Sequence, residues 1–271
     1  LAFTGIYLRP VTREAASRWM LATIPGPINL HLTTDDGPAA QPIAFGYERR
    51  LGGGDVVETR ARAAFTGRAH SVSLHRVVMD DPLSRHDGGA AAPEGTAVVV
   101  VEGRSESAAT GSCALVEAPV YRCELILDEP LDITVDDPLT IRLELHATPD
   151  RWALLEGAAI ATETSWDDGL PLRNGPFDPY GGIYRRDLNL ELYWNDNQAK
   201  RERMLSILDT ADVIAISSNR QWGSLPRISE RFPLVTAYYR HLLGCPPEES
   251  VASCFMDAEP GAVSGELGFD L

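Results

Sequence analysis

Two loops of the sequence hold the side chains best suited to chemistry. The first, residues 165–169, places Trp166 beside Asp167 and Asp168, directly after a predicted strand over residues 158–162. An indole ring can stack on the C–H face of a sugar, and carboxylates accept hydrogen bonds from its hydroxyls. Two carboxylates can also act in acid–base catalysis or bind a hard cation. The alternative is a turn in which the aspartates cap backbone amides and the tryptophan is part of the packing.

The second loop, residues 217–227, follows an apolar run over residues 213–216. Such a run is typical of a strand buried in a parallel sheet, and loops after parallel strands are where open α/β sheets bind ligands. Guanidinium groups can hold a phosphate or a carboxylate through two parallel hydrogen bonds. The alternative is an ordered loop whose arginines pair with nearby acids. The candidate binding residues of this loop are Asn219, Arg220, Trp222 and Arg227.

A third segment, residues 177–184, is rich in aromatic residues and glycine and adds Tyr184 to the candidate binding residues. It could line a site as a flexible lid, and a plain connecting loop is the alternative. The sequence contains no GxSxG, HExxH, Walker or dinucleotide-binding motif, so we assign no catalytic residue. We expect no cofactor, although Asp35 and Asp36 could help to bind Ca²⁺ as an alternative to a simple turn.

The amino-acid composition of the chain limits the classes of partner that it can bind. The chain of 271 residues has 24 basic and 39 acidic residues, which gives a net charge of −15. Such a chain is repelled by polyanions, so we expect no nucleic-acid partner. Its four cysteines lie in two local pairs, Cys113 with Cys123 and Cys245 with Cys254. This spacing fits two disulfides in an oxidising compartment, and four free thiols remain the alternative.

The elements that position these residues change character along the chain. Residues 12–24 predict a helix that ends at the prolines that follow. Eight or so alternating or β-branched runs over residues 28–157 predict an antiparallel β-sandwich. Strand, helix, strand and helix then follow, which predicts a βαβ unit. The last helix is expected from about Phe232, with Pro233 in its first turn and Gly244 as its C-terminal stop. We therefore expect an α/β fold: a small parallel-sheet, Rossmann-like domain of residues 1–27 and 158–271, split by an inserted β-sandwich of jelly-roll or carbohydrate-binding-module type.

Three stretches carry a resemblance to a known family. They are residues 12–25, residues 163–171 with the Trp-Asp-Asp motif, and residues 190–239 with the Ser-Ser-Asn-Arg run. They resemble the extracytoplasmic soluble region of bacterial polytopic glycosyltransferases of the family 39 type, which are lipid-carrier-dependent, protein-mannosyltransferase-like membrane enzymes. In simpler relatives the first helix leads almost directly into the strand with the Trp-Asp-Asp motif, whereas about 130 residues intervene here.

The resemblance implies a location and a role. Membrane helices are expected before Leu1, and the catalytic carboxylate is expected in a region outside this chain. The chain would then be a non-catalytic accessory domain on the extracytoplasmic face, which binds a glycan or a glycosylation acceptor or acts as a scaffold. Its further partner would be the membrane-embedded remainder of its own polypeptide. The matching motif positions are Trp166, Asp167, Asp168, Asn219 and Arg220.

Two other hypotheses remain open on the sequence. One is a free-standing carbohydrate-binding or adhesion module. The other is a hydrolase that uses Asp167 and Asp168 as a carboxylate pair. Adjacent residues on a strand point to opposite faces, so this pair could act together only in a turn.

Overall fold

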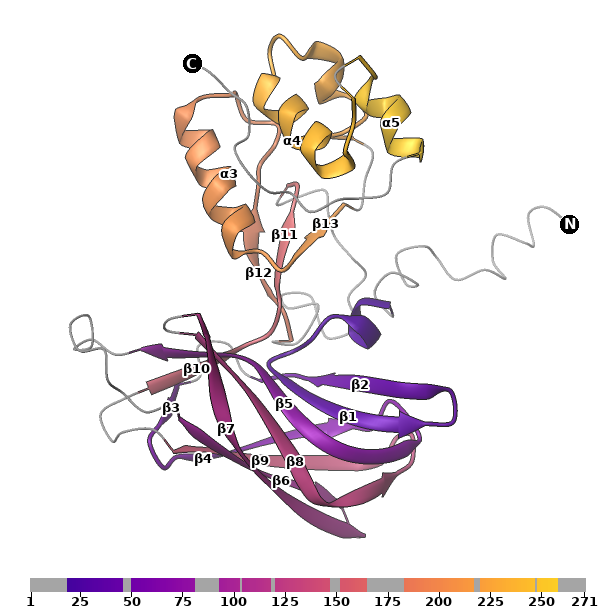
Figure 1. The fold of residues 1–271 in the computed structure, drawn as a ribbon, viewed down its shortest axis with the longest axis vertical. Coiled ribbons are helices and arrows are strands. Elements are labelled where there is room, and N and C mark those ends of the chain that lie inside the picture. The colour runs from indigo at the N-terminus through magenta and orange to yellow at the C-terminus, as the bar shows by residue number, and fades with distance from the viewer. Residues whose placement is uncertain are drawn as a thin grey trace, which may run out of the picture. The chain divides into compact units, whose positions relative to one another are not determined.

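The computed structural model describes residues 19–45, 50–80, 93–102, 104–117, 120–146, 152–164, 183–216, 220–246 and 248–257. The chain divides into two compact units (Figure 1). The first unit takes in Leu1–Ala158 and Leu170–Arg185, and the second takes in Ala159–Gly169 and Arg186–Leu271. Among the described residues, no helix has the length and apolar character needed to cross a membrane.

The first unit is built on one curled, ten-stranded sheet (Figure 1). Its main path runs β2-β1-β5-β8-β7-β6-β9-β4, and β10 joins it by pairing with β5 and with β3. The described ladders of this sheet are antiparallel. The strands are β1 (Ile28–Thr34), β2 (Gly37–Ile43), β3 (Arg50–Gly52), β4 (Val56–Arg62), β5 (Gly67–Asp80), β6 (Glu94–Val101), β7 (Ser105–Glu117), β8 (Val120–Ile133), β9 (Pro138–His146) and β10 (Trp152–Glu156).

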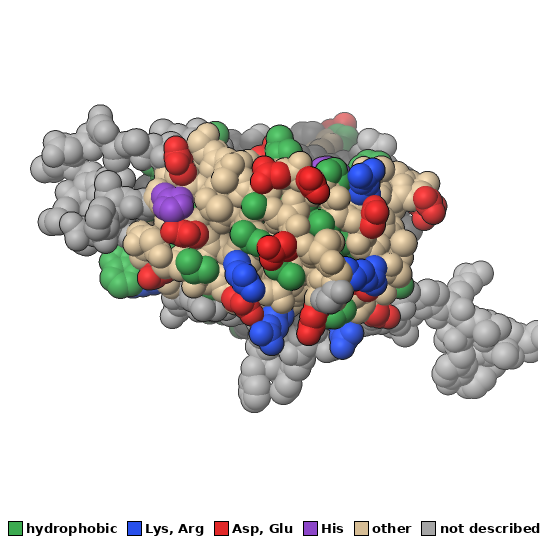
Figure 2. All heavy atoms as spheres, turned by 90° about the horizontal axis from the view of Figure 1, so that it is seen from below, with side chains coloured by type: hydrophobic (Ala, Val, Ile, Leu, Met, Phe, Trp, Pro, Cys, Tyr) green, Lys and Arg blue, Asp and Glu red, His purple; other side chains and the backbone are tan. Residues whose placement is uncertain are grey.

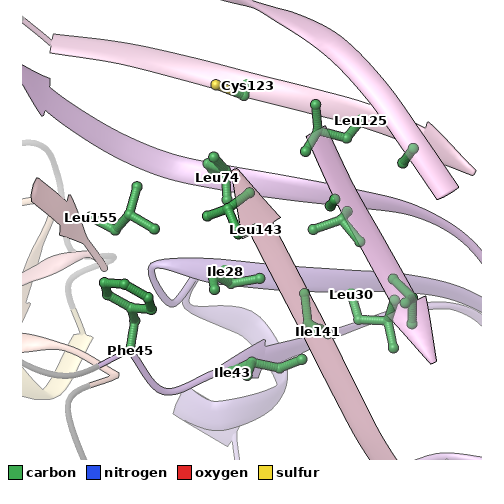
Figure 3. Close-up of a cluster of buried hydrophobic side chains, with 14 of the residues drawn as sticks. Ile28, Leu30, Ile43, Phe45, Leu74, Cys123, Leu125, Ile141, Leu143 and Leu155 are labelled. Atoms are coloured by element: carbon green, nitrogen blue, oxygen red, sulfur yellow. The ribbon is translucent and has the colours of Figure 1, made fainter. Parts of the chain in front are cut away.

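Alternation along these strands creates one apolar face. In β9, Leu139, Ile141, Leu143 and Leu145 are buried, while the residues between them are exposed or half-buried. Because side chains alternate between the two faces of a strand, this pattern places one face of β9 against the apolar core. Figure 3 shows the interior enclosed by the curl, where apolar side chains from β1, β2, β5, β8, β9 and β10 meet. Burying each large aliphatic side chain contributes about 1.5–3 kcal/mol.

The two edge strands of the main path, β2 and β4, are joined by side chains. The Gln41 amide nitrogen donates to the Arg62 carbonyl oxygen at 2.7 Å, and its amide oxygen accepts from the Ala64 backbone N–H at 2.9 Å. The Thr59 hydroxyl donates to the Ala44 carbonyl oxygen at 3.0 Å. No backbone ladder pairs β2 with β4 in the described part of the sheet, so these three bonds close the curl.

Among its described residues, the second unit contains a three-stranded sheet in the order β12-β11-β13, three α-helices and one short 3₁₀ helix. β11 and β13 pair in parallel, with Ile160 opposite Val213. The elements are β11 (Ala159–Thr162), β12 (Arg185–Asn189), α3 (Gln198–Thr210), β13 (Val213–Ala215), the short 3₁₀ helix η1 (Leu225–Ile228), α4 (Pro233–Leu243) and α5 (Val251–Asp257). The predicted helix from about Phe232 is confirmed: Pro233 lies in its first turn, and Gly244 ends it with a left-handed φ of 64°.

The structure decides between the two alternatives for the cysteines. Cys113 of β7 and Cys123 of β8 lie opposite each other in the ladder and form a disulfide. Cys245 and Cys254 form the second, after α4 and within α5. Each unit therefore contains one disulfide that closes a short loop.

The predicted fold class is wrong. Antiparallel β-structure dominates, and parallel pairing in the described residues is confined to the short second sheet, so the chain is not a Rossmann-like parallel-sheet protein with an inserted sandwich. The strands of the first unit also form one continuous sheet. β5 and β8 have 14 residues each, and irregularities in their shared register at Ala69/Ser71 and Leu74/Val77 let them bend. The run over residues 213–216 gives a strand of only three half-buried residues, not a strand buried on both faces.

Candidate functional site

A hollow of about 620 Å³ lies on the outer face of the first unit's sheet. Its polar lining comprises Thr23, Asn29 and His75 and, from outward positions of four strands, His31 of β1, Ser73 of β5, Ser112 of β7, and Arg122 and Glu124 of β8. These last five side chains alternate with the buried ones of the same strands, so they point away from the apolar interior. Four strands from three separate parts of the sequence thus present hydroxyl, imidazole, guanidinium and carboxylate groups to one space.

The hollow exists because small side chains form its floor and a separate segment forms its wall. Ser73, Ser112 and Ala114 stand beside the long side chains of Arg122 and Glu124, which leaves open space above the small ones. Residues 22–25 form the wall, and they comprise the last two residues of a short helix over residues 19–23 and the two residues after it. A pocket with an apolar wall and a few convergent polar groups is typical of small-ligand sites.

Two sets of hydrogen bonds fix the wall. The Asn29 side chain accepts from the Gly26 N–H at 2.7 Å and donates to the Gly26 carbonyl oxygen at 2.9 Å. The hydroxyl of Tyr184 donates to the carbonyl oxygens of Met20 and Ile24, at 2.8 and 3.0 Å. Tyr184 is fully buried, so this predicted binding residue supports the wall of the hollow from behind and does not line it.

His31 and Ser73 form a pair at the centre of the site. Nε2 of His31 and Oγ of Ser73 share a hydrogen bond of 2.7 Å. Burial lowers the pKa of His31 from its usual value near 6.5, the neighbouring His70 lowers the pKa further, and Glu124 opposes both. The imidazole is therefore neutral near pH 7, where it can both donate and accept a hydrogen bond.

Arg122 and Glu124 are exposed and stand two residues apart on the same face of β8. Neither of them makes a hydrogen bond or an ion pair with any residue that the structure describes. Their donors and acceptors are therefore available to a ligand in the hollow.

The predicted residues of the second loop lie in the second unit and are not among the residues that line the hollow. Arg220 and Arg227 are exposed, in a turn and in η1, and Trp222 is half-buried against the core of the second unit. The Ser224 hydroxyl donates to the carbonyl oxygen of Arg220 and orders the turn. Four predicted residues lie outside the described residues: Trp166, Asp167, Asp168 and Asn219.

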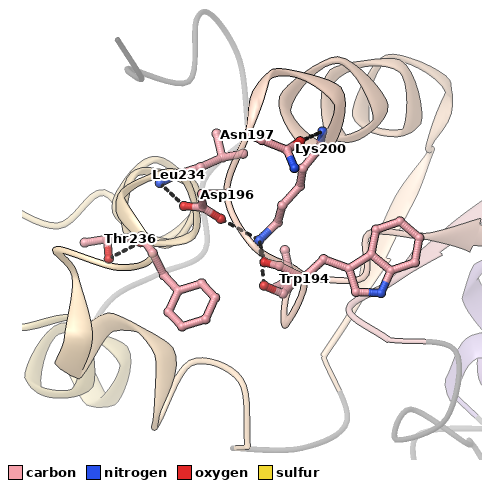
Figure 4. A network of polar contacts seen from close by, with 8 residues as sticks. Trp194, Asp196, Asn197, Lys200, Leu234 and Thr236 are labelled. Carbon is pink, nitrogen blue, oxygen red and sulfur yellow. Dashed lines mark hydrogen bonds and ion pairs between the residues drawn. The ribbon is translucent and has the colours of Figure 1, made fainter. Parts of the chain in front are cut away.

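The second unit has a buried polar network of its own (Figure 4). The ammonium group of Lys200 donates to the Asp196 carboxylate at 2.6 Å and to the carbonyl oxygens of Leu192 and Trp194, at 2.7 and 2.8 Å. The second oxygen of Asp196 accepts from the Leu234 N–H of α4 at 2.6 Å. Burial lowers the pKa of Lys200, and Asp196 opposes that shift. Three donors meet three acceptors, so the network joins elements and leaves no ammonium donor for a ligand.

The structure also describes Asp35 and Asp36, the two residues that could help to bind Ca²⁺. Asp35 and Asp36 form the exposed turn of the β1–β2 hairpin, which ends at Gly37 with a φ of 118°. Within the ranges that the structure describes, no three His, Cys, Asp or Glu residues are grouped so that they could hold a metal ion.

The sequence did not single out His31, Ser73, Ser112, Arg122 or Glu124. Each occupies an outward position of a strand, and His31 and Ser73 are 42 residues apart in the chain. The available signal was the alternation itself, which marks polar positions on one face but does not say which strands are neighbours.

Comparisons with protein-family models, curated proteins and solved structures find no match. What the hollow binds must therefore be argued from its own chemistry.

Proposed function

We propose that the chain is a non-catalytic binding module that holds a glycan in the hollow of the first unit. The observation that carries the proposal is the open space of about 620 Å³ into which His31, Ser73, Ser112, Arg122 and Glu124 converge. Sugar hydroxyls both donate and accept hydrogen bonds, so their recognition needs acceptors and donors side by side. A carboxylate, a guanidinium, two hydroxyls and a neutral imidazole supply that mixture.

The apolar wall adds a second element of recognition. The C–H faces of a sugar ring need an apolar surface, which Ala22, Ile24 and Pro25 offer on one side of the hollow and Ala40 and Pro42 on another. The wall is held by the bonds of Asn29 and Tyr184, so a ligand would meet a preformed surface and lose less free energy in ordering it.

We further propose that this module serves a membrane glycosyltransferase as an extracytoplasmic accessory domain. The resemblance of residues 12–25, 163–171 and 190–239 to that enzyme family supports this role. The two disulfides are in keeping with an oxidising compartment. In this role the hollow would retain the glycan product or the acceptor near the membrane-embedded enzyme.

A glycan array followed by calorimetric titration tests the binding role. The informative variant is Ser112→Arg, which places a long side chain in the hollow from β7. Its matched control is Thr110→Arg, which adds the same charge at an exposed position of the same strand that does not line the hollow. We expect the glycan selected on the array to bind wild type and Thr110→Arg alike and to lose at least about tenfold in affinity with Ser112→Arg.

The opposite results would reject the proposal. If no glycan binds, or if Ser112→Arg binds as wild type does, the hollow is not the binding site. Equal melting temperatures of the two variants would show that the comparison concerns binding and not folding.

A further inference from the structure

The hollow contains a guanidinium group that no described residue neutralises. Arg122 has no hydrogen bond and no ion pair with any residue in the described ranges. Glu124 stands on the same face of the same strand, yet its electrostatic contact is with His31. Arg122 is exposed to solvent, so its guanidinium group is open to an anion that enters the hollow.

Three other arginines of the first unit pair with acids. The guanidinium groups of Arg60 and Arg142 lie 3.1 and 3.4 Å from the Glu58 carboxylate, and Arg104 contacts Asp137. Arg122 differs from these because its neighbour across the β7–β8 ladder, Ala114, is small and uncharged, and the register irregularity at Leu74/Val77 leaves it without a direct ladder partner in β5. Its charge therefore faces the open space and not another side chain.

We infer that the ligand of the hollow is a sugar that carries a carboxylate, and that Arg122 is the residue that selects it. This inference rests on the proposed function, because a glycan must occupy the hollow. A planar guanidinium matches a planar carboxylate through two parallel N–H···O bonds. Ser112 and the His31–Ser73 pair would then receive the ring hydroxyls.

Glu124 adds hydrogen-bond acceptors beside Arg122. Attraction to Arg122 and repulsion by Glu124 both grow with the charge of the anion, so these two charges do not distinguish a carboxylate from a phosphate, and the phosphate probe below makes that distinction. The remaining oxygens of Glu124 can accept hydrogen bonds from hydroxyls next to the carboxylate.

The test titrates the full chain with three probes that differ in one substituent: D-glucuronate, D-glucose and D-glucose 6-phosphate. We expect glucuronate to bind about tenfold or more tightly than glucose, since hydrogen bonds between charged groups contribute about 1.5–3 kcal/mol. Arg122→Gln should remove that preference while it leaves the affinity for glucose within about twofold. Arg142→Gln, at an exposed position outside the hollow, is the matched control and should leave both affinities unchanged.

Three other outcomes would each reject a specific claim. Equal binding of glucuronate and glucose, unaffected by Arg122→Gln, rejects the carboxylate inference and leaves the binding role intact. A preference for glucose 6-phosphate that Arg122→Gln removes assigns the anion as phosphate and rejects the carboxylate. If none of the three probes binds and the glycan array is also empty, the proposed function fails and the inference fails with it.

Discussion

At the scale of single residues, Lys200 shows how the second unit satisfies a buried charge. It is the only lysine of the chain, and its side chain is almost fully buried together with that of Asp196. The three acceptors around its ammonium group come from the segment that precedes α3, and Asp196 also binds the N-terminal end of α4. One ion pair thus fixes how two helices begin.

Lys200→Met should destabilise the second unit by about 3–5 kcal/mol, because it leaves the Asp196 carboxylate buried without a counter-charge. Urea unfolding followed by circular dichroism measures the change. Glu202→Met on the same helix is the control, since this exposed residue should change the free energy of unfolding by less than about 0.5 kcal/mol. A loss as small as that of the control would show that the pair does not hold the unit together.

His31 makes the first unit sensitive to acid. Burial and the nearby His70 lower its folded-state pKa below 6.5. Between that lowered pKa and 6.5 the unfolded chain binds more protons than the folded one, so stability falls as the pH is lowered through this window. His31→Gln should flatten the dependence between pH 7 and 5, as measured by urea titrations at each pH. An unchanged pH profile would contradict this expectation, and His146→Gln, at an exposed histidine of the same unit, is the control.

At the scale of elements, the helix over residues 19–23 depends on a tyrosine from a distant segment. The Tyr184 hydroxyl binds the carbonyl oxygen of Ile24, the residue after the helix, and that of Met20, which also accepts from the Ile24 N–H at 2.8 Å. The last carbonyls of a helix have no partner within it, so an outside donor sets the position of that end. The same residues continue into the wall of the hollow, which links helix termination to the shape of the site.

Tyr184→Phe should therefore lower the stability of the first unit by about 1–3 kcal/mol, because the hydroxyl group that binds the Ile24 carbonyl oxygen is lost. It should also weaken glycan binding through a less ordered wall, although Tyr184 does not line the hollow. Thermal unfolding and titration with the array-selected glycan measure the two effects. Tyr121→Phe, a buried tyrosine of β8 in the same unit, is the matched control. An unchanged affinity of Tyr184→Phe for the glycan would show that the order of the wall does not affect binding.

At the scale of the whole molecule, charge is distributed without a dominant patch on the face shown in Figure 2, where acidic and basic side chains alternate with hydrophobic ones. The chain nevertheless carries a net charge of −15, which favours solubility and opposes compaction. Covalent links offset part of that opposition, since each unit contains one disulfide, Cys113–Cys123 or Cys245–Cys254.

Removing either disulfide should cost about 2–3 kcal/mol, because both close loops of about ten residues and restrict the unfolded chain. The variants are the double substitutions Cys113→Ala with Cys123→Ala, and Cys245→Ala with Cys254→Ala. Hydrogen exchange resolved by segment should show the loss of protection in the unit that contains the removed bond. A loss that appears equally in both units would contradict this assignment.

The sequence predicted local features better than it predicted pairing. The limits of α4 followed from Pro233 and Gly244, because a fixed φ and a left-handed turn are local properties. The single curled sheet did not follow, because it depends on partners such as β5 and β10, which lie far apart in the chain. The residues of the hollow could not be predicted for the same reason. Arg122 and His31 are ordinary outward-facing residues until the ladders bring β1, β5 and β8 together.

The side-chain bonds of Gln41 and Thr59 make the junction between β2 and β4 the place where the curled sheet can open most easily. Elsewhere in the curl, separating two neighbouring strands breaks a ladder of backbone bonds, but here three side-chain hydrogen bonds are released. At about 1 kcal/mol each, these bonds are a small part of what holds the sheet. The sheet can thus open locally between β2 and β4 while the strand order stays intact. Amide hydrogens beside this junction should therefore exchange with solvent before those of the central strands.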